Sequence, residues 1–151
     1  MIRLIIIADD FTGGLDTGVQ FSQKGIRTRV VTDWKTDYLQ AAGECQVLVI
    51  VSETRHLSSS EAARIVSAIV RKAVAPDIPF IYKKTDSGLR GNIGAELSAA
   101  LNAGAEFITF FSISRFQENC CNGVVNCSSQ NDPTCGAILK ARFCQKYLFK
   151  P

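Results

Sequence analysis

Ten residues near the middle of the chain combine groups that bind anions with groups that bind hydroxyls. The segment Lys83–Asn92 (KKTDSGLRGN) holds three cations, one carboxylate, two hydroxyls, one amide and two glycines. It follows the apolar run 78–82, where a strand should end and a helix should begin. Free backbone N–H groups at a helix N-terminus bind anions, and Lys and Arg add full positive charge. The segment therefore predicts a site for an acidic, hydroxylated ligand.

Two more polar clusters follow apolar runs earlier in the chain. Asp9–Gly14 (DDFTGG) comes after the run 2–8, and Ser52–His56 (SETRH) comes after the run 45–51. In an open parallel sheet, ligands bind outside the carboxyl ends of the strands. The three clusters are therefore predicted to meet at one edge of a sheet.

The adjacent acids Asp9 and Asp10 leave several roles open. They could bind ligand hydroxyls, hold Mg²⁺ or act as a base for a hydroxyl. Equally, one could cap the following helix while the other is solvated. Gly13 and Gly14 permit close backbone approach, but neither a P-loop nor a dinucleotide fingerprint is present.

The cations are assigned by their geometry. Neighbouring residues of a strand point to opposite faces, so only one lysine faces the cleft, and Lys84 is favoured over Lys83. Arg90 suits a carboxylate because its planar fork pairs with two oxygens. Asp86 is either a helix cap or an ionised acceptor for hydroxyls. His56 is the only histidine, and it is interpreted as a surface residue.

The hydrophobic pattern alternates strands with helices, which predicts an α/β fold. We expect a three-layer α/β/α arrangement with a mostly parallel, Rossmann-like sheet, as an incomplete N-terminal domain. One helix should be capped by Thr12, carry apolar positions at Leu15 and Val19, and end at Gly25. Another should begin with a capping box at Ser58. Expected strands are 2–8, 27–31, 45–51, 79–83 and 107–111, and expected helices include 35–42, 62–73 and 93–101.

The bulk composition is that of one globular domain. The chain has 151 residues, 46% of them hydrophobic and 21% charged, with a formal net charge of +3. No basic stripe stands out, so a nucleic-acid partner is not expected. The apolar run at 4–8 is too short for a membrane span or a signal peptide, which makes the cytoplasm the default location and excludes a membrane partner.

The end of the chain departs from this pattern. Five of the six cysteines lie at residue 120 or later, and residues 112–136 show neither helical nor strand periodicity. No export signal supports disulfides, and the cysteine spacing lacks the C-x2-C pairs of zinc sites. Residues 137–149 could be helical. We therefore divide the chain into an α/β domain at 1–111 and an aberrant, Cys-rich tail at 112–151.

Three motifs together resemble the four-carbon acid sugar kinase family. They are IADDFTGGLDTGVQF, SETRH and KKTDSGLRGNIGAEL, and the resemblance covers roughly residues 2–111. Proteins of this family phosphorylate threonate-, erythronate- or 3-oxo-tetronate-type acids with ATP. Their N-terminal α/β domain binds the sugar acid, and a separate C-terminal domain binds ATP. The resemblance implies the same sugar-acid role for 1–111.

The resemblance also implies which residues form the site. Glu53 and Arg55 would lie near the rim of an acid-sugar pocket, and no catalytic residue is assigned. ATP and Mg²⁺ are expected for the full-length family, whereas this chain should hold no cofactor and no metal. A small sugar acid is the expected partner, and a homo-oligomer is left open. The residues expected to line the pocket are Asp9, Asp10, Lys84, Asp86, Arg90 and Asn92.

The family pattern stops near residue 111, and the chain lacks the ATP-binding domain. Back-translating residues 110–123 with degenerate codons and reading one base later permits FPYPGFRKTVVTG, a string much closer to the family. We therefore expect a truncated chain with a frameshifted tail, inactive as a kinase by itself. Coding DNA in which no single-base change restores a long open frame would contradict this hypothesis.

Two other hypotheses remain. One is a stand-alone α/β ligand-binding module that uses the same pocket. The other is a Mg²⁺-dependent phosphohydrolase or receiver-like domain built on Asp9 and Asp10. It is disfavoured because Ser52 or Glu53 stands where a receiver needs its aspartate, and because the D-x-D spacing of a hydrolase is missing.

Overall fold

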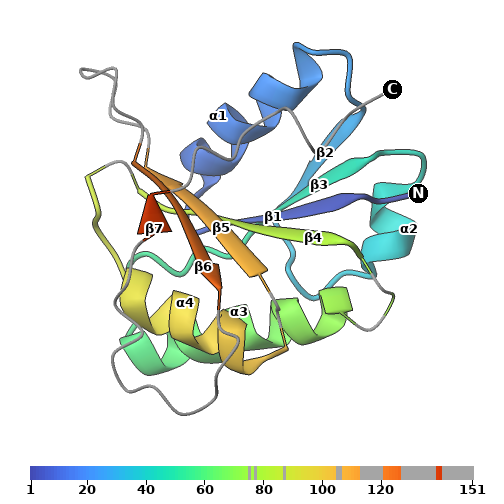
Figure 1. Ribbon diagram of the computed structural model, residues 1–151. Helices are drawn as coiled ribbons and strands as arrows, with labels where there is room; N and C mark the ends of the chain where they lie inside the picture. Colours follow the sequence, from blue (N-terminus) through green and yellow to red (C-terminus); the bar gives the residue numbers. More distant parts are fainter. Residues whose placement is uncertain are drawn as a thin grey trace.

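One mixed sheet organises the molecule. The computed structural model describes residues 1–74, 76, 78–86 and 88–104, and the backbone of three strands after them. In the described part of the chain seven strands form the order β2-β3-β1-β4-β5-β6-β7 (Figure 1). The first five are parallel, whereas β6 and β7 are antiparallel to their neighbours. The strands are β1 (Leu4–Ala8), β2 (Thr28–Val31), β3 (Val47–Val51), β4 (Phe80–Lys84), β5 (Phe107–Ser112), β6 (Cys121–Asn126) and β7 (Leu139–Lys140).

Helices cover both faces of this sheet. Helix α1 (Phe11–Ser22) lies on one face, and α3 (Ser59–Val74) and α4 (Ile93–Asn102) lie side by side on the other (Figure 1). The short α2 (Tyr38–Ala42) packs with the α3 side of the core. The arrangement confirms the predicted three-layer α/β/α fold with a mostly parallel sheet.

The two central strands explain why the sheet is buried on both sides. Every residue of β1 and β3 is buried, as expected for apolar runs in a covered parallel sheet. Along β1 the side chains alternate, so Ile5 and Ile7 join the α3/α4 cluster while Leu4 and Ile6 join the cluster under α1. The same alternation determines on which face of the sheet the side chain at the end of a strand lies.

Helix α3 follows the sequence prediction closely. Its apolar stripe is buried, and the capping box forms: the Glu61 N–H donates to Ser58 Oγ and the Ser58 N–H donates to Glu61 Oε2, each at 3.4 Å. The start predicted for 35–42 is too early, because Asp37 caps α2 by accepting from Gln40 N at 2.8 Å. That helix therefore begins at Tyr38.

Helix α1 departs from the prediction in two ways. Its cap is Asp10, whose Oδ1 accepts from Gly13 N at 3.0 Å, so the prediction of Thr12 was wrong. The buried face carries Gly13, Gly14, Thr17 and Gly18, while Leu15 and Val19 are exposed. The glycines let the helix backbone approach the sheet: a Cβ on Gly14 would lie 2.9 Å from Val51 Cγ2. Close backbone packing, not an apolar stripe, seats this helix.

The region after residue 111 is described only in part. Strand β5 ends at Ser112, and β6 and β7 extend the sheet beyond it. Leu139–Lys140 form a strand, so the helix predicted for 137–149 is wrong there, and the rest of that range lies outside the described residues. The same holds for four of the five tail cysteines, Cys121 in β6 being the exception. The boundary at 111 stays a prediction.

Within the described residues, no helix has the length and apolar character needed to cross a membrane.

Candidate functional site

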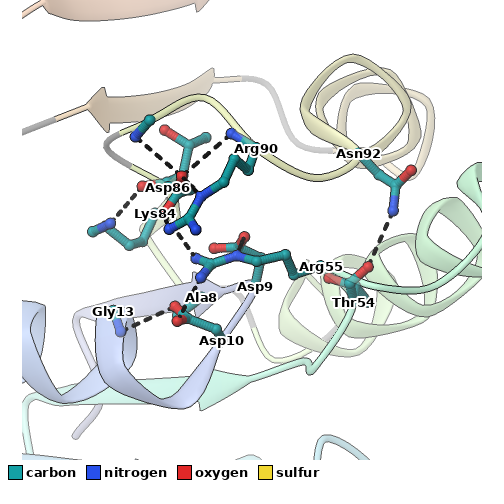
Figure 2. Close-up of polar contacts among 12 residues, drawn as sticks. Ala8, Asp9, Asp10, Gly13, Thr54, Arg55, Lys84, Asp86, Arg90 and Asn92 are labelled. Carbon is teal, nitrogen blue, oxygen red and sulfur yellow. Dashed lines mark hydrogen bonds and ion pairs between the residues drawn. The ribbon is translucent and has the colours of Figure 1, made fainter.

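A polar pocket of about 370 Å³ lies at the carboxyl ends of β1, β3 and β4. All three clusters singled out in the sequence contribute to it (Figure 2). Its wall therefore consists of the start of α1, the loop after β3 and the loop after β4. The lining residues are Asp10, Thr12, Gly13, Asp16, Arg55, Lys84, Asp86 and Arg90.

Arg55 stands at the centre of the charged groups. Its Nε lies 2.8 Å from Asp9 Oδ2 and its Nη1 lies 2.7 Å from Asp10 Oδ2. Its Nη2 lies 3.4 Å from Asp86 Oδ1, so one guanidinium joins carboxylates from two loops. Burial alone would lower the pKa of Arg55, but the Asp9 hydrogen bond and the three carboxylate charges together raise it. Arg55 is the hub of the site rather than a residue of its rim.

Asp86 orders the loop after β4. Its Oδ2 accepts from the backbone N–H of Gly88 at 3.0 Å and from Arg90 Nε at 2.7 Å, and its Oδ1 accepts from Arg90 Nη2 at 2.9 Å. The side-chain hydrogen bonds from Arg90, followed by the nearby positive charges, hold the pKa of Asp86 well below its usual range. The Arg90 fork that was assigned to a ligand carboxylate is thus engaged by Asp86, although its side chain stays 71% exposed.

Lys84 is the pocket cation that has no carboxylate partner among the described residues. Its ammonium donates to the carbonyl of Thr85, and an ammonium carries three donors in all. The side chain is buried against the glycine face of α1, where a Cβ on Gly13 would lie 3.5 Å from Nζ. Desolvation is the largest influence and lowers the pKa of Lys84, despite the three surrounding aspartates. The structure places Lys84 here and Lys83 on the opposite face, as the strand alternation predicted.

The two acids after β1 have different environments. Asp10 caps α1 with one oxygen and pairs with Arg55 through the other. Asp9 is only 3% exposed, and its Oδ1 is buried with no hydrogen-bond partner in the described part of the chain. The expectation that one acid caps the helix is met, whereas the idea that the other is solvated is wrong. Asp9 was predicted to line the pocket, but it lies outside the described lining and contacts it through Arg55.

Three residues from the predicted clusters lie beside the pocket. Asn92 donates through Nδ2 to the carbonyls of Thr54 and Leu57, at 3.1 and 2.9 Å, and so ties the start of α4 to the loop after β3 (Figure 2). Glu53 is exposed and takes a positive φ of 51°, while His56 is exposed on the same loop. None of these three belongs to the described pocket lining.

Sequence reasoning missed the lining residue Asp16, and it assigned Thr12, which lies in the predicted cluster 9–14, to a helix cap instead of the pocket wall. A usable signal existed, because residues four apart on a helix share a face, and both lie on the first turns of α1 near Gly13. Their hydroxyl and carboxylate add polar groups to the α1 wall of the pocket.

Three carboxylates of the site, those of Asp9, Asp10 and Asp86, are paired with Arg55. Within the described residues, no group of three or more acidic, Cys or His side chains is arranged to hold a metal ion.

Comparison with known sequences identifies the architecture. The family described as the sugar-binding N-terminal domain matches residues 4–128, which is most of the chain. The chain belongs to that domain family, which is found in four-carbon acid sugar kinases. The match runs past residue 111, the end of the α/β domain proposed from sequence.

Curated relatives of this sugar-binding domain are sugar-acid kinases. The D-threonate kinase of Salmonella typhimurium is 43% identical over 103 residues, covering 68% of this chain and 24% of the relative. The D-erythronate kinase of Heliobacterium modesticaldum is 34% identical, covering 68% and 23%. The D-threonate kinase of Bordetella bronchiseptica is 37% identical, covering 67% and 25%. The chain thus spans about a quarter of the length of these relatives.

A solved structure also resembles the sugar-binding domain. It is a domain of unknown function from Bordetella bronchiseptica, crystallised as a domain-swapped dimer with bound citrate. It superposes with a TM-score of 0.60 at 34% identity, covering 67% of this chain and 26% of that one. The α/β architecture is therefore shared with an experimentally determined member.

Proposed function

We propose that this chain binds a four-carbon sugar acid of the threonate, erythronate or 3-oxo-tetronate type in the pocket around Arg55. The observation that carries the proposal is the mixture of groups in one pocket: cations that can hold a carboxylate beside carboxylates that can accept hydroxyl hydrogens. The identities of the curated relatives support the same ligand class. A short polyol carboxylate needs both kinds of group at close range.

Lys84 is the proposed anchor for the ligand carboxylate. Among the described residues, both arginines have carboxylate partners, whereas the Lys84 ammonium, which carries three donors, is bonded to one carbonyl. The N-terminus of α1 beside it adds partial positive charge. Asp10 and Asp16 on the α1 wall are then the nearest acceptors for ligand hydroxyls.

We further propose that the chain is the substrate-binding portion of an ATP-dependent kinase and does not phosphorylate by itself. Support comes from the family match, which is to a sugar-binding domain, and from the lack of a nucleotide-binding motif in these 151 residues. Purified chain incubated with ATP, Mg²⁺ and D-threonate should form no phosphorylated product. Steady ATP-dependent turnover would refute this part.

Binding is tested by calorimetric titration of the purified 151-residue chain with D-threonate and D-erythronate. Threitol, which lacks the carboxylate, should bind at least about tenfold more weakly, since one charge-assisted hydrogen bond contributes roughly 1.5–3 kcal/mol. Lys84→Met should lose the preference for the acid over threitol, and the exposed Lys24→Met serves as the matched control. Equal binding of threitol and threonate by the wild type would overturn the proposed site. A stand-alone binding module would bind the acid in the same way, so the turnover assay of a longer gene product separates the two.

A further inference from the structure

A second charged cluster lies on the other face of the sheet, directly behind the pocket. Lys83 Nζ lies 2.8 Å from Glu96 Oε2, and these side chains are 1% and 2% exposed. The Thr54 hydroxyl donates to Glu96 Oε1, and the Ser52 hydroxyl lies 2.9 Å from that of Thr54. Three elements, the end of β4, the loop after β3 and α4, therefore meet at one carboxylate.

This cluster connects to the pocket through the backbone. Lys83 Nζ also donates to the carbonyl of Lys84 at 2.9 Å, and Lys84 is the proposed anchor on the opposite face. Thr54 immediately precedes Arg55, and the backbone N–H groups of both donate to the Asp9 carbonyl, at 3.1 and 3.3 Å. Arg55 and Lys84 are thus each one residue away from a side chain that contacts Glu96, namely Thr54 and Lys83.

Stability alone is a weak reason for such an ion pair. Two charged groups withdrawn from water lose hydration that their mutual attraction barely offsets, and well-packed apolar residues are often as stable or more so. The hydrogen bonds that this pair accepts and donates, however, fix the ends of β3 and β4, the two strands that flank β1, against one helix. An apolar pair of similar volume would fill the space without fixing those positions.

We propose that Glu96 and Lys83 are positioning residues, which hold Arg55 and Lys84 in the register needed to bind the ligand. Glu96 fixes the Arg55 loop through Thr54, and Lys83 fixes the Lys84 carbonyl. The effect on affinity rests on the proposed sugar-acid site, whereas the effect on Arg55 geometry does not. At metal sites, mutating the residues that hydrogen-bond to the ligating side chains typically lowers affinity roughly 10–100-fold, and we expect a similar loss of ligand affinity here.

The first test is the double variant Lys83→Met with Glu96→Met, which replaces the ion pair by an apolar pair. Thermal unfolding monitors the fold, calorimetry measures D-threonate binding, and the Arg55 Nε–H resonance in ¹⁵N NMR of the ligand-free chain reports the guanidinium. The expected result is a melting temperature near that of the wild type, binding weakened at least about tenfold and a displaced Arg55 signal. A folded double variant with wild-type affinity and an unmoved Arg55 signal overturns the proposal.

A second pair of variants keeps the proposal falsifiable if the double variant does not fold. Thr54→Val keeps the shape but removes the hydroxyl that donates to Glu96, and Thr54→Ser keeps the hydroxyl. Thr54→Val should move the Arg55 signal and weaken binding about three- to tenfold, and Thr54→Ser should restore both. Identical behaviour of the two overturns the proposal. If the wild type binds no sugar acid, the sugar-acid proposal fails, and the Arg55 signal in the ligand-free variants still decides the positioning role.

Discussion

Replacing Arg55 by Met should be the most damaging single change at the site. The side chain is 12% exposed and pairs with Asp9 at 2.8 Å, Asp10 at 2.7 Å and Asp86 at 3.4 Å. Methionine keeps the length of the apolar stem but leaves three neighbouring carboxylates without their shared cation. Removing one partner of a buried pair costs about 3–5 kcal/mol, and the partial exposure of Asp10 argues for the lower half of that range.

Urea denaturation followed by circular dichroism measures this cost. At pH 7 the free energy of unfolding should fall by about 3–4 kcal/mol for Arg55→Met. Arg55→Lys keeps the charge but can place it against only one carboxylate, so we expect about half of that loss. The matched control is Arg27→Met, whose pair with Glu44 is exposed at 3.3 Å and is worth less than about 0.5 kcal/mol.

The stability lost in Arg55→Met should also depend on pH, and it should be larger at neutral than at acidic pH. The folded-state pKa of Asp86 is depressed, so its contribution to stability is present above the unfolded-state value of about 3.9 and is lost as the pH falls toward the folded-state value. In Arg55→Met the pKa of Asp86 is depressed less than in the wild type, because the charge of Arg55 is one of the causes that lower it. The difference in the free energy of unfolding between wild type and variant, here called the gap, should therefore narrow below about pH 4. A gap under about 1 kcal/mol at pH 7, or one that stays constant down to pH 3, would refute the reasoning.

Three further predictions concern the pocket walls. Gly14→Ala should lower the free energy of unfolding by about 1–3 kcal/mol, because the new Cβ would lie 2.9 Å from Val51 Cγ2. Gly94→Ala, whose Cβ would have no atom within 4 Å, should instead raise it by about 0.5–1 kcal/mol, and equal urea midpoints for the two variants would contradict the packing argument. Gly13→Ala would place a Cβ 2.6 Å from Asp10 Oδ1, so it should displace that oxygen from the helix cap, lower the free energy of unfolding by about 1–2 kcal/mol and weaken threonate binding in calorimetry. Unchanged binding would mean that the start of α1 does not form a wall of the pocket. Threonate affinity should decline as the pH rises through the lowered pKa of Lys84, because only the charged ammonium attracts the carboxylate. The affinity of Lys84→Arg should stay constant over the same pH range, and parallel plots of affinity against pH for the two proteins would exclude Lys84 as the anchor.

Much of the fold followed from patterns that are local in the sequence. The runs that became β1 and β3 are apolar at every position, which only a sheet covered on both faces accommodates. The stripe of α3 and its capping box are likewise local signals. The strand period of two was enough to separate Lys84 from Lys83. These predictions succeeded because each depends on residues within one element.

The seating of α1 could not be predicted from the same kind of pattern. Leu15 and Val19 are the apolar pair spaced four residues apart on the helix, yet they are exposed at 43% and 44%. The buried face is made of Gly13, Gly14 and Gly18, which carry little hydrophobic signal. What decides the orientation is the distance between helix and sheet, since a side chain on Gly14 would collide with Val51. That distance is a tertiary quantity that no helical periodicity contains.

The roles of the charged residues also depend on pairing that residue types do not specify. Arg90 suits a carboxylate in isolation, but Asp86, four residues earlier, already occupies its fork. That pair is largely exposed on the Arg90 side, and exposed pairs contribute little, so a ligand carboxylate could displace it at small cost. The Arg55 ion pairs are buried, so replacing one of their carboxylates by a ligand carboxylate would cost more free energy. Any rearrangement on binding should therefore be confined to Arg90 and its loop, while Arg55 and Lys84 form the fixed part of the site.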